Sequence, residues 1–238
     1  MARKLRLKLI LIFVAASLIY NTYAQNYCSS GLPPAVWENW FNQKVKDQSQ
    51  KMLAGKSNLV NRTIPVIVHV IHFGETSGTY PNIDSSQVIS QIAALNRDFS
   101  GMGESLNNIP DQFAPFVSNT GIQFCRATVD YSGTPMVEQG VNRVSAAANS
   151  WQSPSTPTLN LQNYFNTVII PATIWDPKKY LNIWVSDRPS VSSLVSFGTY
   201  PPSSSQIGLF DGSNIGTPTN DGIWVYAKAF GTTGNVSP

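Results

Sequence analysis

Charged residues are scarce in this 238-residue chain, because Asp, Glu, Lys and Arg make up 12% of it, about half the share in an ordinary globular protein. Histidine and cysteine are scarcer still, with two of each. A catalytic zinc ion takes three protein ligands, so few residues are left to build such a site. Apolar residues at 42% and aromatic residues at 11% are enough for a folded core and exclude disorder for most of the chain.

The two histidines, His69 and His72, lie three positions apart in a segment typical of a strand. Successive side chains of a strand alternate between faces, so this pair does not bind one metal ion together. We expect His69 to be a buried, hydrogen-bonded residue and His72 to lie at the strand end. The sequence also lacks an H-E-x-x-H motif, a G-x-S-x-G turn and a closely spaced pair of carboxylates. Its residue inventory alone therefore identifies no reaction centre.

Residues 1–24 have the composition of a secretory signal peptide. Four basic residues precede an apolar run at 9–20, and the small residues Thr22 and Ala24 precede Gln25. The run is shorter than the roughly 20 residues that span a bilayer, which disfavours a membrane anchor. Removal of this segment leaves 12 basic and 13 acidic residues, a net charge of −1. We therefore expect a secreted protein with no nucleic-acid partner and no membrane contact after signal removal.

The two cysteines, Cys28 and Cys125, are able to pair in an exported protein, and the sequence alone leaves their pairing open. Cys125 follows Phe124 within an expected strand, a setting that favours a core or disulfide thiol over a nucleophile. The stretch Asp-Gly-Ser-Asn at 211–214 carries oxygen ligands suited to calcium. The stretch is short, so a plain turn is the favoured explanation.

The hydrophobic pattern predicts an α+β fold. Residues 64–72 are apolar on both faces, as in a central strand. A capping box at 84–87 begins a helix expected over 85–99, with a buried stripe of Val88, Ile92, Leu95 and Phe99. Further strands are expected at 122–129, 180–185 and 222–227, with a short extended piece at 194–202 and a loop at 145–163. We expect a twisted mixed sheet of four or five strands with the helix packed on it.

Residues 25–63 form a separate leader in this interpretation. Pro33 and Pro34 precede an expected helix, where proline suits the first turn. Its aromatic and apolar residues recur at helical spacing and are Trp37, Trp40, Phe41 and Val45. We expect an amphipathic arm that packs on another surface, followed by a linker.

Five segments, in order, resemble the opening of the pappalysin/cytophagalysin-type metzincin peptidases. They are Ile64-Pro-Val-Ile-Val-His-Val-Ile-His72, 89–99, 122–127, 175–185 and 221–234. The resemblance covers about 64–234 and implies a metzincin-like N-terminal subdomain. It also implies secreted zinc-dependent proteolysis of a protein or peptide substrate, in which zinc activates the attacking water. Calcium remains a second candidate cofactor.

In that family, the zinc-binding helix H-E-x-x-H-x-x-G-x-x-H follows a segment similar to Phe230-Gly-Thr-Thr-Gly234. Here the sequence stops at Pro238, so the resemblance implies no catalytic residue within it. We expect 64–238 to be an incomplete subdomain whose partner is the missing C-terminal half of the catalytic domain. The chain alone is expected to be inactive, with exposed strand faces where that half would pack. The alternative is a non-catalytic extracellular binding module derived from such a peptidase.

The resemblance also implies two non-catalytic roles. Ser196–Pro201 matches the antiparallel edge strand that binds substrate main chain by strand addition, although an ordinary edge strand fits equally well. The candidate substrate-binding residues are Phe197, Gly198, Thr199 and Tyr200. Cys28 stands where some relatives carry a zinc-ligating pro-segment cysteine, in competition with a Cys28–Cys125 disulfide. Relatives often have a second cysteine at the position of Ser186, so Cys125 is expected to lack its usual partner.

Overall fold

The computed structural model of the chain describes residues 35–53, 61–103, 108–199 and 219–237. The expected signal peptide, Cys28, Tyr200 and the 211–214 stretch lie outside these residues. The helices are α2 (Ala35–Leu53), α3 (Ser85–Phe99), η2 (Ala114–Phe116), α4 (Leu161–Tyr164), η3 (Phe165–Ile169), α5 (Ile170–Thr173) and η5 (Ala227–Ala229). The strands are β1 (Arg62–His72), β2 (Ile122–Arg126), β3 (Val141–Ser145), β4 (Leu181–Ser186), β5 (Ser196–Gly198) and β6 (Ile223–Tyr226). Within the described ranges, no helix has the length and apolarity to cross a membrane.

One mixed sheet organises the described chain, with strand order β2-β1-β4-β6-β5. The first half of β1 pairs with β2, its second half pairs with β3, and its other edge pairs with β4, all in parallel. β5 is antiparallel to β6. The predicted α+β class is confirmed, and the sheet has six strands instead of four or five. The additional strand is β3, whose half-buried sequence VNRVS carries little hydrophobic signal.

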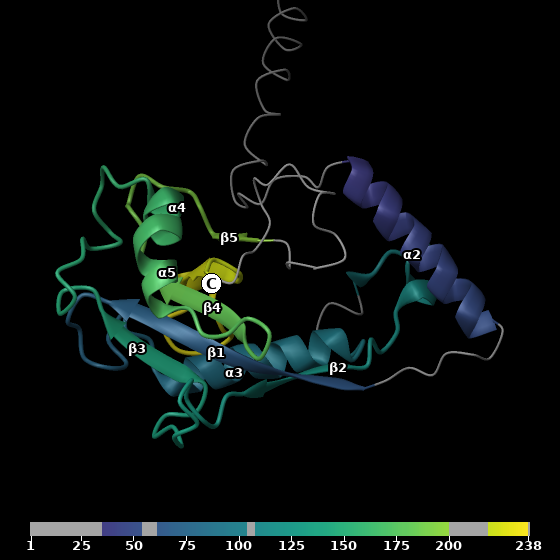
Figure 1. Cartoon of the computed structure of the whole chain (residues 1–238), viewed down its shortest axis with the longest axis horizontal. Coiled ribbons are helices and arrows are strands. Elements are labelled where there is room, and N and C mark those ends of the chain that lie inside the picture. Colours follow the sequence, from purple (N-terminus) through teal and green to yellow (C-terminus); the bar gives the residue numbers. More distant parts are fainter. Residues whose placement is uncertain (1–34, 54–60, 104–107, 200–218, 238) are drawn as a thin grey trace, which may run out of the picture.

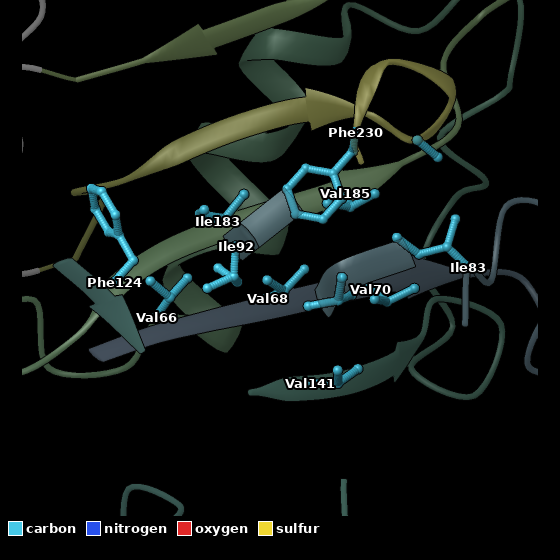
Figure 2. Close-up of a cluster of buried hydrophobic side chains, with 12 residues drawn as sticks. Val66, Val68, Val70, Ile83, Ile92, Phe124, Val141, Ile183, Val185 and Phe230 are labelled. Atoms are coloured by element: carbon cyan, nitrogen blue, oxygen red, sulfur yellow. The ribbon is translucent and has the colours of Figure 1, made fainter. Parts of the chain in front are cut away.

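β1 is buried on both faces, as its sequence predicts. Val66, Val68 and Val70 belong to the cluster that includes α3 residues, and Figure 2 shows them in a row beneath Ile92. Ile71 belongs to a second cluster with residues of α4, η3 and α5. Figure 1 shows these helices and α3 on opposite sides of the sheet.

Helix α3 has the predicted bounds because its N-terminus carries the expected cap. The Asp84 side chain accepts hydrogen bonds from the Gln87 amide at 3.0 Å and from the Ser86 hydroxyl at 2.6 Å. These contacts satisfy a main-chain donor that the first helical turn leaves unpaired. Val88 and Ile92 are buried, so the predicted apolar face is the one that packs on the sheet.

A helical run over 161–173 begins in the last three residues of the predicted loop at 145–163 and continues through residues for which the sequence predicted no element. Its sequence contains β-branched residues and Pro171, which are unfavourable inside an α-helix. The structure accommodates them with a π-helical turn at 165–169 and with Pro171 in the first turn of α5. Phe165 and Ile169 are fully buried against the sheet, so tertiary packing outweighs the weak local preference.

The sequence predicted that the strands would leave an apolar face exposed. This prediction is wrong for most of β4 and β6. Trp184, Val185 and Trp224 are fully buried. Ile223 is 38% exposed, while Leu181 and Val225 are half-buried. The helices on the two sides of the sheet provide this cover, so β4 and β6 present no continuous bare apolar face among the described residues.

Arg143 joins β3 to the loop that follows β1. Its guanidinium donates to both carboxylate oxygens of Glu138 at 2.6 and 2.8 Å. It also donates to the Ile83 carbonyl at 2.7 Å and to the side chain of Asn82, which is buried. One side chain therefore fixes the end of this loop just before α3 begins.

Replacing Arg143 by alanine is expected to lower the free energy of unfolding by about 2 kcal/mol, because it leaves partly buried acceptors without their donor. Urea unfolding followed by tryptophan fluorescence measures the change. Lys179→Ala is the control, since it removes an exposed 3.8 Å ion pair with Asp176 and should change stability by less than about 0.5 kcal/mol. Equal effects of the two substitutions would contradict the prediction.

Candidate functional site

β5 occupies the position that the resemblance implied for a substrate-binding strand. It is the last strand in the order, beyond β6, and it runs antiparallel to its neighbour. Figure 1 shows it beyond β4 and close to the lower end of α4. An edge strand of this kind is where an extended peptide is able to add to a sheet.

The hydrogen-bond register fixes which main-chain groups of β5 point away from β6. The Tyr226 amide donates to the Val195 carbonyl at 2.9 Å, and the Thr199 amide donates to the Gly222 carbonyl at 3.1 Å. Bonded and non-bonded pairs alternate along an antiparallel ladder. Ser196 and Gly198 therefore direct their N–H and C=O groups away from β6.

The side chains of the candidate residues have different surroundings. Phe197 is 4% exposed and stacks on Trp224, with ring centroids 5.2 Å apart. It therefore anchors β5 on the sheet, and only its main chain is near the edge. A Cβ on Gly198 would lie 3.3 Å from the Gly222 carbonyl oxygen, so the absence of a side chain allows the two strands to approach closely. Tyr200 is outside the described residues.

Thr199 links the end of β5 to the beginning of β6. Its hydroxyl donates to Asp221 Oδ1 at 3.0 Å and accepts from the Gly222 amide at 3.1 Å. Burial raises the pKa of the Asp221 carboxyl, and the bond from Thr199 partly offsets this rise. Asp221 is thus a half-buried carboxylate held in one orientation beside the edge strand.

A groove of about 530 Å³ opens beside Thr199 and Asp221. It crosses the first residues of β1, β4 and β6 and is completed by the turn before β4. Its lining residues include Ile64, Lys178, Tyr180, Leu181 and Ile223. The sequence gives no sign of this groove, because its walls come from four segments that only the sheet brings together.

His69 has the role that the sequence predicts. It is fully buried, with Nε2 3.0 Å from Asn182 Oδ1 and Nδ1 2.9 Å from Asn142 Nδ2. Asn182 Oδ1 also accepts from the Trp175 amide, and its Nδ2 donates to the Trp175 carbonyl. These bonds fix the Asn182 orientation, so Nε2 of His69 carries the proton and Nδ1 accepts. Burial lowers the His69 pKa to about 4.

His72 lies at the end of β1 and takes no part in this network. It is half-buried, and its Nδ1 accepts from the Gly74 amide at 3.2 Å. Burial lowers the pKa of its ring. The prediction that the two histidines do not share a site is therefore confirmed by their different partners.

No group of three or more His, Cys, Asp or Glu side chains is placed to hold a metal ion within the residues that the structure describes. Cys28 and the 211–214 stretch lie outside them, so the zymogen ligand and the calcium site stay predictions. Cys125 is a free, half-buried cysteine. The described residues therefore include an antiparallel edge strand and a groove, but no metal centre.

The position of Ser186 is unsuited to a disulfide with Cys125. Cys125 pairs with Pro65, and Val185 pairs with Val70, so residues 125 and 186 lie about 20 Å apart along β1. A disulfide needs Cα atoms within about 7 Å. Position 186 of this chain is therefore too far from Cys125 for a disulfide between them. Ser186 is buried, accepts from Trp224 Nε1 at 2.9 Å and donates to the Asp187 carbonyl at 2.6 Å.

The segment after β6 is held against the beginning of α3. Gln87 Nε2 donates to the carbonyls of Ala227 at 3.0 Å and Phe230 at 2.7 Å. Gln87 Oε1 accepts from the Asn235 amide at 2.9 Å, and Gln91 Oε1 accepts from the Gly231 amide at 2.7 Å. Side chains of α3 therefore determine the path of the main chain over 227–235.

The known proteins that resemble this chain were found among solved structures. No family model matches the sequence, and no curated protein matches it. A Tannerella forsythia promirolysin mutant is 25% identical, with a TM-score of 0.60 over 89% of this chain. Mature mirolysin from the same organism, in complex with a cleaved peptide, is 27% identical, with a TM-score of 0.55 over 76%. Mirolysin in complex with compound 9 is 28% identical, with a TM-score of 0.54 over 75%.

The chain spans 63% of the promirolysin chain and 57% of each mirolysin chain. These neighbours are metallopeptidases of the pappalysin/metzincin type. The likeness supports a metzincin-like fold for this chain and relates it to that class of peptidases.

Proposed function

We propose that this chain is the N-terminal portion of a secreted zinc-dependent endopeptidase, and that these 238 residues alone do not cleave peptides. The observation that carries the proposal is β5, an antiparallel edge strand in a metzincin-like sheet. Zinc, when bound, would supply an activated water for peptide hydrolysis. The described residues form no metal site, so the zinc ligands would come from the missing C-terminal half of the catalytic domain.

The role of β5 in this proposal is to bind the main chain of a protein or peptide substrate. Ser196 points its main-chain groups away from β6, while Phe197 fixes the strand through its contact with Trp224. A peptide that adds here forms hydrogen bonds at alternate residues. The mature mirolysin neighbour is in complex with a cleaved peptide, which supports a peptide as the ligand class.

The leader belongs to the same proposal. Promirolysin matches 89% of this chain, whereas the two mature mirolysin structures match 75% and 76%. This difference supports residues 25–63, which include α2, as an arm similar to a pro-segment. Residues 1–24 would direct secretion, and Cys28 would ligate zinc in the inactive precursor.

The test of peptide binding uses N-methylated peptides, which leave the protein unchanged. A fluorescent twelve-residue extended peptide is titrated with the chain, and the dissociation constant is measured by fluorescence anisotropy. Methylation of alternate amides should weaken binding about tenfold, because each facing amide loses one hydrogen bond. Methylation of the intervening amides should have little effect. Equal effects at all positions would contradict binding along β5.

Hydrolysis separates the peptidase from the non-catalytic binding module. The protein encoded by the whole gene should cleave a quenched fluorescent peptide in the presence of zinc, and a zinc chelator should stop cleavage. The 238-residue chain should show no cleavage under the same conditions. Peptide binding without cleavage by the whole gene product would favour the binding module. Cleavage by the 238-residue chain would contradict its proposed inactivity.

A further inference from the structure

A short loop leads from β4 to the edge strand β5, and one arginine spans it. Nη1 of Arg188 donates to the Leu194 carbonyl at 2.5 Å, six positions further along the chain. The Arg188 guanidinium also lies over the ring of Tyr226, with Cζ 4.2 Å from the ring centroid. The side chain is half-buried, and a charged donor forms a stronger hydrogen bond than a neutral one. Arg188 therefore holds the two ends of this loop together.

The two contacts of Arg188 fix the beginning of β5 relative to β6. Leu194 lies two positions before Ser196, the first residue of β5, and Tyr226 is the last residue of β6. Beside them, the Tyr226 amide donates to the Val195 carbonyl at 2.9 Å. β5 is only three residues long, so its position depends strongly on the contacts at its ends.

The main chain of Arg188 is itself held in place by Asp187. Asp187 Oδ1 accepts from the Arg188 amide at 2.7 Å and from the hydroxyl of Tyr80. Tyr80 belongs to the loop after β1 and packs edge to face on Tyr226, with ring centroids 6.4 Å apart. The arginine therefore extends from a base that is supported by the segments following β1, β4 and β6.

We propose that Arg188 is a positioning residue for peptide binding, which aligns β5 so that a polypeptide is able to add along it. This inference rests on the proposed function of β5 as the substrate-binding strand. The main-chain groups of Ser196 point away from β6, and an added strand needs such donors and acceptors in line with the sheet. A strand that is held in line before binding removes the cost of ordering it during binding. Arg188 acts through Leu194 and Tyr226, without touching the peptide itself.

The first test replaces Arg188 by methionine, which keeps an unbranched side chain beside Tyr226 but has no donor for the Leu194 carbonyl. Fluorescence anisotropy gives the dissociation constant of a neutral, extended twelve-residue peptide. Loss of one charged hydrogen bond should weaken binding about tenfold. Lys228→Met is the matched control, because Lys228 is an exposed cation 5.0 Å from the ring centroid of Tyr80. Its ring contact is on the loop after β1 and not on the chain that leads into β5, so the affinity should stay unchanged.

Chemical rescue separates positioning from a general loss of stability. Arg188→Ala leaves space beside Tyr226 for a small cation, so millimolar methylguanidinium should restore most of the lost peptide affinity. It should restore nothing in Arg188→Met, whose side chain fills that space, and sodium chloride should restore nothing in either variant. Guanidinium ions weaken folded proteins in general, so a merely structural defect would not improve. Thermal unfolding followed by circular dichroism checks that the variants fold.

A conservative variant and a measurement without peptide complete the test. Arg188→Lys keeps a charged donor near Leu194 but loses the planar group over Tyr226, so its affinity should lie between those of the wild type and Arg188→Met. Amide hydrogen exchange should be faster in Arg188→Met at Tyr226, whose amide donates to the chain leading into β5. Exchange at Val68, whose amide donates to Gly140 from the central strand β1, should be unchanged.

The outcomes separate this inference from the proposed function. Wild-type affinity in Arg188→Met, an equal loss in Lys228→Met, or no rescue of Arg188→Ala overturns the positioning role and leaves β5 as the binding strand. Unchanged exchange at Tyr226 in Arg188→Met also overturns it. Failure of the wild-type chain to bind any extended peptide overturns the proposed function, and this inference with it.

Discussion

Replacing Gln87 by leucine is expected to lower the free energy of unfolding by about 4 kcal/mol and to release residues 227–237 from α3. The Gln87 side chain is fully buried and bonds to the Ala227 and Phe230 carbonyls and to the Asn235 amide. Leucine has a similar size but no polar atoms. All three main-chain groups would lose their partner, and each such loss costs roughly 1–3 kcal/mol.

Two glycines allow the loop after β6 to pass close to Gln87. A Cβ on Gly231 would lie 2.8 Å from Gln87 Cγ, and a Cβ on Gly234 would lie 2.7 Å from Gln87 Oε1. Both glycines also have positive φ, at +92° and +83°, a conformation that favours glycine. A side chain at either glycine would therefore collide with Gln87.

Two measurements test the Gln87 prediction. Urea unfolding gives the change in stability, and amide hydrogen exchange shows whether residues 231–237 lose protection. Gln123→Leu is the matched control, because Gln123 is exposed on β2 and the same substitution there should change stability by less than about 0.5 kcal/mol. Unchanged exchange at 231–237 in Gln87→Leu would show that the loop does not depend on this residue.

The Gln87 contacts also bear on the proposed function. In the resembling family, the zinc-binding helix follows the segment that corresponds to 230–234. In the proposed peptidase, Gln87 and Gln91 hold the segment that leads into the zinc-binding helix. They would thereby position the beginning of that helix without being part of the catalytic site. Gln87→Leu in the whole gene product should then reduce peptide cleavage more than it reduces peptide binding along β5.

Acidification from pH 6.5 to pH 4 is expected to cost the protein about 3 kcal/mol through His69 alone. The unfolded chain binds a proton on this ring with the ordinary pKa of 6.5, whereas folded His69 has a pKa of about 4. Between these values the unfolded state holds more protons. The stabilisation by neutral His69 is therefore complete above pH 6.5 and falls as the pH falls toward 4.

The physical reason for the low pKa is the apolar and amide surroundings of the ring. His69 stacks on Trp184 with centroids 5.2 Å apart, and its nitrogens face the amides of Asn142 and Asn182. A proton on Nδ1 would face the Asn142 amide group, which is itself a donor in this arrangement. The bond to Asn182 raises the pKa slightly, but burial is the larger effect.

Nuclear magnetic resonance titration of the two histidine rings measures this pKa directly, with His72→Gln used to assign the signals. Urea unfolding at several pH values should show the predicted fall in the free energy of unfolding between pH 6.5 and pH 4, both in the wild type and in His72→Gln. His69→Gln should be less stable at pH 7 and should lack the part of the pH dependence that His69 supplies. A His69 pKa near 6.5 would contradict the assignment of a buried, neutral ring.

Local signals in the sequence were sufficient for β1 and α3. Both faces of the strand at 64–72 carry apolar residues, and both faces are buried in the structure. Asp84 and Gln87 predicted the helix N-terminus because a cap depends on residues three positions apart. The family resemblance predicted an antiparallel edge strand at this place, and β5 is antiparallel and last in the strand order.

Weak local signals explain the elements that the sequence analysis missed. β3 is five residues long and half polar, and the run 161–173 contains β-branched residues and a proline. Both elements are stabilised by packing in the protein core, where Val141 and Phe165 are buried. A pattern read within one segment does not contain that information.

The sequence by itself determined the α+β class, the two-sided central strand, the capped helix and the buried state of His69. Each depends on side-chain polarity and spacing within about a dozen residues. Only the tertiary structure decided the groove at Asp221, the Asn182 contact of His69 and the contacts of Gln87 with 227–235. These partners are far apart in the chain: His69 and Asn182 are separated by 113 positions, and Gln87 and Ala227 by 140. Strand order brings them together, and strand order is fixed by the burial of the whole sheet.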